Sequence, residues 1–119
     1  MKKIICILLL LLTLGLFSAC SKISDEELTQ AREAVKNGAI IVDVRTAKEF
    51  NQKHIKGAIN VPIEAIMKGN IKLPKNKEIV VYCRTGSRSS ISARVLKEQG
   101  WTVHDVATQG EWEREIKEK

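Results

Sequence analysis

Apolar residues recur along the chain with two different spacings, which predict helices and strands. Ser24 and Glu27 form a capping box, and the apolar positions that follow it at helical spacing predict a helix that ends near Gly38. Strands are predicted over residues 39–44, 58–61, 78–82 and 101–106, which are rich in apolar residues. The run over 39–44 is broken only by Asp43, as is typical of a strand that is covered on both faces of a parallel sheet.

Helices are predicted in the intervals between these runs. A second capping box, from Thr46 to Glu49, predicts a short helix that carries Phe50 inward. Because helices and strands alternate in order, the pattern predicts an α/β fold with a parallel sheet and helices on both faces. In such sheets the reactive groups lie at the carboxyl ends of strands. Further helices are predicted over 63–67, 89–99 and 110–119.

The first residues of the chain predict an export signal that is not part of the fold. Lys2 and Lys3 make a basic start, and the apolar stretch that follows ends at Leu16. This stretch is shorter than the roughly 20 residues that a membrane-spanning helix needs. We therefore expect a cleaved signal and not a retained membrane anchor.

The end of this signal is similar to a bacterial lipobox, in which a small residue precedes a cysteine that becomes lipidated. The segment reads Phe17-Ser18-Ala19-Cys20. We expect residues 1–19 to be a lipoprotein signal peptide, residues 20–23 a tether lipidated at Cys20, and residues 24–119 one domain. The protein would then be exported and anchored by lipid to a bacterial membrane, facing the periplasm or the cell exterior. The alternative is plain cleavage, which would give a soluble secreted protein.

Length and charge limit the classes of partner. Cleavage before Cys20 would leave 100 of the 119 residues, enough for one compact domain. The formal charge of +6 would fall to +4 with the loss of Lys2 and Lys3. This mild excess suits small anionic substrates or an anionic membrane surface. Basic residues are scattered among acidic ones without an aromatic pattern, so we expect no nucleic-acid partner. We expect the domain to be a monomer.

The three cysteines have different predicted fates. Cys6 leaves with the signal and Cys20 would be acylated, so Cys83 remains as the free thiol and no intramolecular disulfide is expected. His54 and His104 have no ligand spacing with Cys83, which disfavours a metal site. We expect neither a metal nor a cofactor.

Cys83 is the strongest candidate for chemistry, because it ends an apolar run and precedes a polar turn. A strand that ends at a thiol, turns and enters a helix places backbone N–H groups around the sulfur. The helix macrodipole and two guanidinium groups would favour the thiolate, which is the nucleophilic form. A buried structural cysteine is the alternative, but the small and polar residues that follow disfavour it. The residues after Cys83 that are candidates for binding an anion are Arg84, Thr85, Gly86, Ser87, Arg88 and Ser89.

Other polar and aromatic residues have structural interpretations. Asp43 and Arg45 follow a predicted strand and are expected to form an ion pair that fixes the neighbouring loop. His54 is expected to make a local hydrogen bond and not to act as a general base. Trp101 and Trp112 are expected in the core or at docked helices.

Two blocks of this sequence resemble the rhodanese family of sulfurtransferases, in particular its single-domain exported bacterial members. The first block is Ile41-Val42-Asp43-Val44-Arg45 with Glu49-Phe50 and His54-Ile55-Lys56-Gly57-Ala58-Ile59-Asn60-Val61-Pro62. The second is Val80-Val81-Tyr82-Cys83-Arg84-Thr85-Gly86-Ser87-Arg88-Ser89. The resemblance implies one rhodanese-like domain with a mostly parallel, five-stranded sheet and helices on both faces.

The resemblance also implies a reaction. The Cys83 thiolate would attack the outer sulfur of thiosulfate or a similar donor, release sulfite, and hold the sulfur as a persulfide until a thiophilic acceptor removes it. Backbone N–H groups of residues 84–89 would hold the charge on the terminal sulfur. Arg84 and Arg88 are candidates for binding the sulfonate end of the donor, and Gly86 provides the turn.

Three other functions are compatible with the same residues. Cysteine phosphatases also place a thiolate in an anion-binding loop, but with five residues between cysteine and arginine, whereas Cys83 and Arg88 are separated by four. Arsenate reductases use a similar loop with additional thiols. A membrane-tethered domain that binds an anion or a partner without turnover is the third alternative.

Overall fold

Four parallel strands form the centre of the computed structural model, which describes residues 22–117. The sheet order is β2-β1-β3-β4, so β3 lies between two neighbours and all of its residues are buried. These strands confirm the four apolar runs, but five strands were expected, and within residues 22–117 none precedes the first helix. The strands are β1 (Ile40–Asp43), β2 (Ile59–Asn60), β3 (Ile79–Cys83) and β4 (Val103–Thr108).

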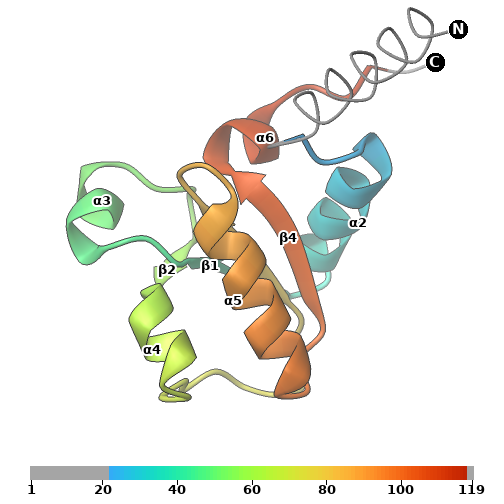
Figure 1. Cartoon of the computed structure of the whole chain (residues 1–119). Coiled ribbons are helices and arrows are strands. Elements are labelled where there is room, and N and C mark those ends of the chain that lie inside the picture. The colour runs from blue at the N-terminus through green and yellow to red at the C-terminus, as the bar shows by residue number, and fades with distance from the viewer. Residues whose placement is uncertain (1–21, 118–119) are drawn as a thin grey trace, which may run out of the picture.

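Helices cover both faces of this sheet, as predicted. Figure 1 shows α4 and α5 in front of the sheet, α2 beyond β4, α6 above β4, and α3 at the side of β2. Both predicted capping boxes are present, because Ser24 caps α2 with Glu27 and Thr46 caps α3 with Glu49. The helices are α2 (Asp25–Lys36), α3 (Ala47–Gln52), α4 (Ile63–Met67), α5 (Ser87–Glu98) and α6 (Gln109–Glu113).

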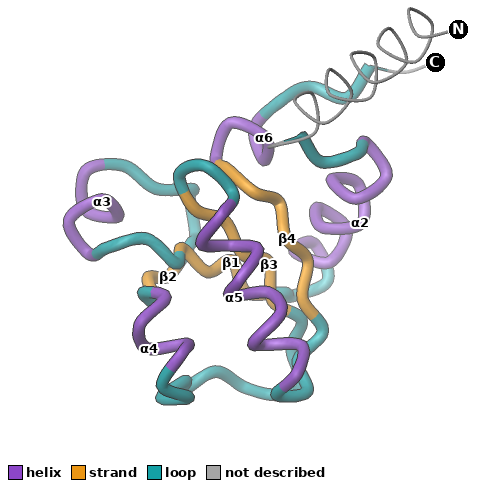
Figure 2. Tube along the Cα trace, in the orientation of Figure 1, coloured by secondary structure: helices purple, strands orange, loops and turns teal. Residues whose placement is uncertain are grey.

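Alternation along the strands divides the core into two layers. Val81 and Cys83 belong to the layer that packs beneath α4 and α5, together with Ile66 and Leu96. The side chain of Tyr82 points to the opposite layer, which α2 covers. The strands therefore run between two helical layers, as the trace in Figure 2 shows. This arrangement places the Cys83 thiol on the α5 side of the sheet.

The predicted terminal helix is wrong in its length, because α6 ends at Glu113 and not near residue 119. Arg114 has extended backbone angles, φ −66° and ψ 151°, and its guanidinium contacts Asp25 at 2.6 Å and the carbonyl oxygen of Ile23 at 3.0 Å. Arg32 of α2 donates to the carbonyl oxygens of Trp112 and Arg114. These contacts with α2 stabilise an extended backbone after Glu113, and the charge spacing of this short polar segment is not enough to continue the helix.

The start of the chain lies mostly outside the described residues. The signal peptide predicted over 1–19 and the lipid site at Cys20 are therefore still predictions. At the end of the predicted tether, the Ile23 N–H donates to Glu111 Oε1 at 3.0 Å, and the side chain packs against the α2 layer of the core. Ile23 is therefore held by the domain. Within residues 22–117 no helix has the length and apolar character to cross a membrane.

Candidate active site

The Cys83 thiol lies at the carboxyl end of the central strand, against the first turn of α5. Only 2% of this residue is exposed, so any reacting sulfur must approach it closely. The backbone N–H of Gly86 donates to Cys83 Sγ at 3.0 Å. Gly86 occupies the N-cap position of α5 and has no side chain with which to cap the helix. The first N–H groups of α5, and the positive end of its dipole, therefore lie beside the sulfur.

The turn that follows Cys83, residues 84–89, is called the loop below and depends on the backbone freedom of Gly86. Its φ of +96° lies in the left-handed region, and a Cβ atom there would lie 3.3 Å from Cβ of Ala107. Ala107 itself has a φ of +64°, and its N–H donates to Asp105 Oδ1 at 2.9 Å. The end of β4 thus closes against the loop in a strained conformation, which sequence reasoning missed. The spacing of Asp105 and Ala107 is a sequence signal for this contact, since Asp side chains often accept a hydrogen bond from the N–H two residues later.

The three hydroxyl residues of the loop differ in position. Ser89 is fully buried, and its Oγ donates to the Gly86 carbonyl oxygen at 3.1 Å. Thr85 and Ser87 are exposed, and their hydroxyl oxygens are 3.1 Å apart. Ser89 therefore supports the turn from inside, while Thr85 and Ser87 lie at the outer rim of the loop.

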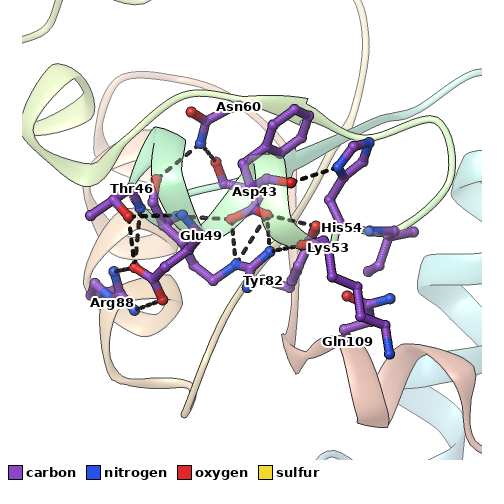
Figure 3. Close-up of polar contacts among 12 residues, drawn as sticks. Asp43, Thr46, Glu49, Lys53, His54, Asn60, Tyr82, Arg88 and Gln109 are labelled. Atoms are coloured by element: carbon purple, nitrogen blue, oxygen red, sulfur yellow. Dashed lines mark hydrogen bonds and ion pairs between the residues drawn. The ribbon is translucent and has the colours of Figure 1, made fainter.

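The two loop arginines, predicted together as anion ligands, have different surroundings. Arg84 is exposed directly after Cys83. Arg88 instead makes a two-pronged ion pair with Glu49 of α3, at 2.8 Å between Nη1 and Oε1 and 3.1 Å between Nη2 and Oε2. Figure 3 shows this pair beside the capping contacts of Thr46. Glu49 was predicted only as a capping residue, so its contact with the loop was missed.

The ion pair shifts the pKa of both partners in the direction that keeps them charged. Hydrogen bonds from Arg88 lower the pKa of Glu49 to about 2, with smaller effects from its Thr46 contacts and the charge of Arg88. The pKa of Arg88 is raised, first by its hydrogen bonds to Glu49 and further by the charges of Glu49 and Cys83. The pair is therefore charged at neutral pH, and it joins α3 to the start of α5.

A buried polar network supports the site from the other side of the sheet. Asp43 is fully buried and accepts from Arg45 at 2.7 Å and from the Tyr82 hydroxyl at 2.8 Å, which confirms the predicted Asp43–Arg45 ion pair. The Tyr82 oxygen accepts from the Ile55 N–H at 3.0 Å. Desolvation raises the pKa of Tyr82 to about 12, so the hydroxyl keeps its proton. This network joins β1, β3 and the segment after α3 (Figure 3).

The remaining predicted residues have structural positions. His54 Nδ1 lies 2.8 Å from the Phe50 carbonyl oxygen, and the two rings stack at 3.8 Å between centroids, so the local contact is confirmed. Trp101 is buried and Trp112 packs against the α2 layer of the core. Within residues 22–117, no three His, Cys, Asp or Glu side chains come together as a candidate metal site.

Comparison with known families identifies a match over most of the chain. The rhodanese-like domain model matches residues 25–109. A sulfurtransferase of Allochromatium vinosum is 35% identical over 81 residues, which cover 68% of this chain and 75% of that protein. The thiosulfate sulfurtransferase PspE of Escherichia coli is 33% identical over 63 residues, which cover 51% of this chain and 61% of PspE. The matched segment spans only 33% of a further relative, from Bacillus subtilis.

Solved structures agree with this result. The reduced CoADR-RHD protein of Bacillus anthracis is 32% identical with a TM-score of 0.61, and the match covers 71% of this chain and 15% of that one. A rhodanese-related protein of Thermoplasma volcanium is 28% identical with the same TM-score of 0.61, and the match covers 71% of this chain and 85% of that one. The chain belongs to the rhodanese-like domain family, which includes sulfurtransferases.

Proposed function

We propose that the protein transfers sulfane sulfur from thiosulfate or a similar donor to a thiophilic acceptor through a persulfide on Cys83. One observation carries the proposal: the Gly86 N–H lies 3.0 Å from Cys83 Sγ at the start of α5, which has no side-chain cap at Gly86. Backbone donors and a helix dipole aimed at a thiol stabilise negative charge on that sulfur, or on a second sulfur attached to it.

The reaction consists of two displacements at sulfur. In the first, the Cys83 thiolate attacks the outer sulfur of thiosulfate, a new S–S bond forms, and the original S–S bond breaks with its electron pair leaving on sulfite. In the second, the acceptor, cyanide in an assay or a thiolate, attacks the outer sulfur of the persulfide. The Cys83 thiolate is regenerated, and the acceptor leaves as thiocyanate or as a new persulfide.

The two loop arginines would contribute unequally to binding the donor. Arg84 is exposed and free to meet the sulfonate group of thiosulfate. Arg88 would bind the same group through hydrogen bonds that its pairing with Glu49 leaves available, since a guanidinium has five N–H donors. A thiosulfate donor is also supported by the name of the Escherichia coli relative.

A steady-state assay with cyanide as acceptor tests the proposal. Wild type should release sulfite from thiosulfate, and Cys83→Ser should abolish the release while the circular dichroism spectrum is retained. Cys20→Ser is the matched control, because it removes a thiol outside the loop and should keep turnover. Sulfite release by Cys83→Ser would refute the proposal. Binding of thiosulfate without any turnover by wild type would favour a binding domain, and hydrolysis of a phosphate ester would favour a phosphatase.

We further propose that the domain is exported and held at a membrane by lipid on Cys20. The basic start, the apolar stretch and the Ser18-Ala19-Cys20 sequence support this assignment. Metabolic labelling with a clickable fatty acid should mark the wild-type protein in bacterial membranes. Cys20→Ala should lose the label, while Cys6→Ala should keep it. Equal labelling of the wild type and Cys20→Ala would exclude lipid at Cys20.

A further inference from the structure

Ile23 is fixed to the domain through both its backbone and its side chain. Its N–H donates to Glu111 Oε1 at 3.0 Å, its carbonyl oxygen accepts from Arg114 Nη2 at 3.0 Å, and its side chain packs against the α2 layer of the core. Only two residues lie between Ile23 and Cys20, where lipid is proposed. Three extended residues span at most about 11 Å, whereas a domain of this size has a radius of gyration of about 13 Å. A lipid on Cys20 would therefore keep this end of the domain at the bilayer surface.

A surface hollow lies at this end, between the start of α2 and the chain that follows α6. Its volume is about 520 Å³, and we call it the terminal hollow. Its charged lining residues are Lys22, Asp25, Arg114, Glu115 and Lys117. Arg114 is paired with Asp25 at 2.6 Å. Lys22 and Lys117 are exposed, and neither forms an ion pair with another residue in the range 22–117. Two ammonium groups of the terminal hollow are therefore available to an anion.

The loop after Cys83 lies at the same end of the molecule. Cys83 pairs in the sheet with Thr108, which caps α6, and Glu111 of α6 holds Ile23. Figure 1 shows α6 beside the start of α5, with the start of α2 at the same end. The five residues of α6 span about 8 Å. A bilayer against the terminal hollow would therefore lie about one short helix away from the loop.

We propose that the terminal hollow rests on the phosphate groups of the bilayer in which Cys20 is anchored, and that this contact holds the loop beside the headgroups. The proposal rests on the lipid at Cys20 proposed above. Lysine side chains close to a bilayer are attracted to its anionic surface. The carboxylate of Glu115 offsets part of this attraction, so the surface binds weakly by itself. The short tether populates the contact, because it raises the effective concentration of headgroups. A protein is a poorer occupant, since the tether leaves little room between this end and the bilayer.

Fluorescent labels at three positions measure the orientation. The full-length chain with Cys83→Ser is expressed in bacteria and purified from membranes, so that Cys20 is lipidated and an introduced cysteine is the remaining thiol. Each cysteine carries nitrobenzoxadiazole, and each protein is added to vesicles of phosphatidylethanolamine and phosphatidylglycerol that contain nitroxide-labelled headgroups. The three exposed positions are Glu26→Cys in the first turn of α2, Thr85→Cys in the loop and Asn76→Cys before β3.

We expect the nitroxide to quench the labels at Glu26 and Thr85 and to leave the label at Asn76 nearly unchanged. The tether alone would bring Glu26 near the bilayer, so charge reversals are needed to detect docking. Lys22→Glu together with Lys117→Glu should lower the ratio of docked to undocked protein about tenfold, because two attractive charges become repulsive. Quenching at Glu26 and Thr85 should fall accordingly.

A second pair of reversals is the control. Lys36→Glu and Lys72→Glu change two exposed cations that do not line the terminal hollow, and quenching should be unchanged. Unaltered quenching with Lys22→Glu and Lys117→Glu would show that the tether alone positions the domain. Equal losses with both pairs would show an effect of net charge. Either result would overturn the proposal.

Failure of the lipid proposal can be told apart from failure of docking. The intact mass of the purified protein shows whether Cys20 carries lipid. A mass without lipid removes the lipid proposal and the docking together, whereas a lipidated protein whose quenching ignores the charges of the terminal hollow refutes docking alone. Sulfite release by the wild-type protein tests sulfur transfer independently of either result.

Discussion

Arg88 contacts Glu49 with both of its terminal nitrogens and also lies in the loop that follows Cys83. The carboxylate fixes the guanidinium, but it also offsets part of the positive charge near the sulfur. Arg84 differs from Arg88 because it is exposed at the surface of the loop. At the scale of single residues, the loop therefore combines one cation held in an ion pair and one exposed cation.

Removing Arg88 should weaken the use of thiosulfate. Arg88→Ala takes away a charged ligand and leaves Glu49 unpaired beside an anion site. We therefore expect KM for thiosulfate to rise about tenfold, the lower end of the range that corresponds to roughly 1.5–3 kcal/mol for a hydrogen bond to a charged group. Adding Glu49→Gln should recover part of this loss, which a double-mutant cycle measures. Arg94→Ala, on the same helix, is the control. Unchanged kinetics in Arg88→Ala would remove Arg88 from donor binding.

The ion pair should also make stability depend on pH. The pKa of Glu49 is lowered in the folded state from 4.5 to about 2, so its contribution to the free energy of unfolding is complete above pH 4.5 and is lost as pH falls towards 2. The side chains of Arg88 and Glu49 are 30% and 21% exposed, so we expect a contribution of only about 1 kcal/mol.

Urea unfolding at pH 7 and pH 3 measures this contribution. Glu49→Gln should be less stable than wild type at pH 7, and the difference should shrink at pH 3. Glu64→Gln, which changes an exposed carboxylate on α4, is the control and should show little difference at either pH. A Glu49→Gln difference that stays constant between the two pH values would contradict a charged pair.

At the scale of elements, the site depends on how β3, α5 and the end of β4 meet. Gly86 and Ala107 approach closely, both with positive φ, where the loop passes β4. On the other side of the sheet, the Tyr82 hydroxyl connects Asp43 of β1 to the backbone of Ile55. The loop is therefore held between a strained strand end and a buried polar network.

Two glycine substitutions distinguish the stability cost of a side chain at positive φ from the effect of a changed loop shape on sulfur transfer. Gly86→Ala and Gly38→Ala both place a side chain at positive φ, which costs about 1–2 kcal/mol of stability. Only at Gly86 would the new Cβ meet another side chain, that of Ala107 at 3.3 Å, whereas at Gly38 no described atom lies within 4 Å.

We therefore expect both variants to lose stability in urea, and only Gly86→Ala to lose sulfur transfer as well. Rates are compared under conditions in which both variants are folded. A Gly86→Ala protein with wild-type turnover would show that the sulfur does not need this loop geometry.

Much of this arrangement could be predicted from the sequence, because it depends on local signals. The apolar run before Cys83 and the polar residues after it located the strand, the turn and the helix. The contact of Glu49 with Arg88 could not be predicted, since it joins residues 39 positions apart and depends on where α3 packs. Charge spacing alone also overextended the last helix, because Arg32 and Arg114 draw that segment onto α2.

At the scale of the whole molecule, the two ends of the described chain are tied together. The Arg32 guanidinium lies 6.0 Å from the ring of Trp112 and donates to two carbonyl oxygens at 2.6 Å each. Arg114 contacts Asp25 in return. These contacts hold α6 and the residues after it against α2.

Removing Arg32 should loosen this end of the molecule. We expect Arg32→Ala to cost about 2 kcal/mol, because it removes hydrogen bonds of a charged donor to two backbone carbonyls. Hydrogen exchange should become faster in α6 and remain slow in β3. Lys36→Ala, on the same helix and exposed, should leave both segments unchanged. Unaltered protection of α6 in Arg32→Ala would show that these bonds do not hold it.

The most direct test of sulfur transfer is the intact mass of the protein after thiosulfate treatment. We expect the wild type to gain the mass of one sulfur atom, located on Cys83 by peptide mapping, and to lose it when cyanide is added. Cys83→Ser should gain nothing under the same conditions. A wild-type protein whose mass does not change with thiosulfate, or an added sulfur that stays after cyanide, would contradict a transferable persulfide on Cys83.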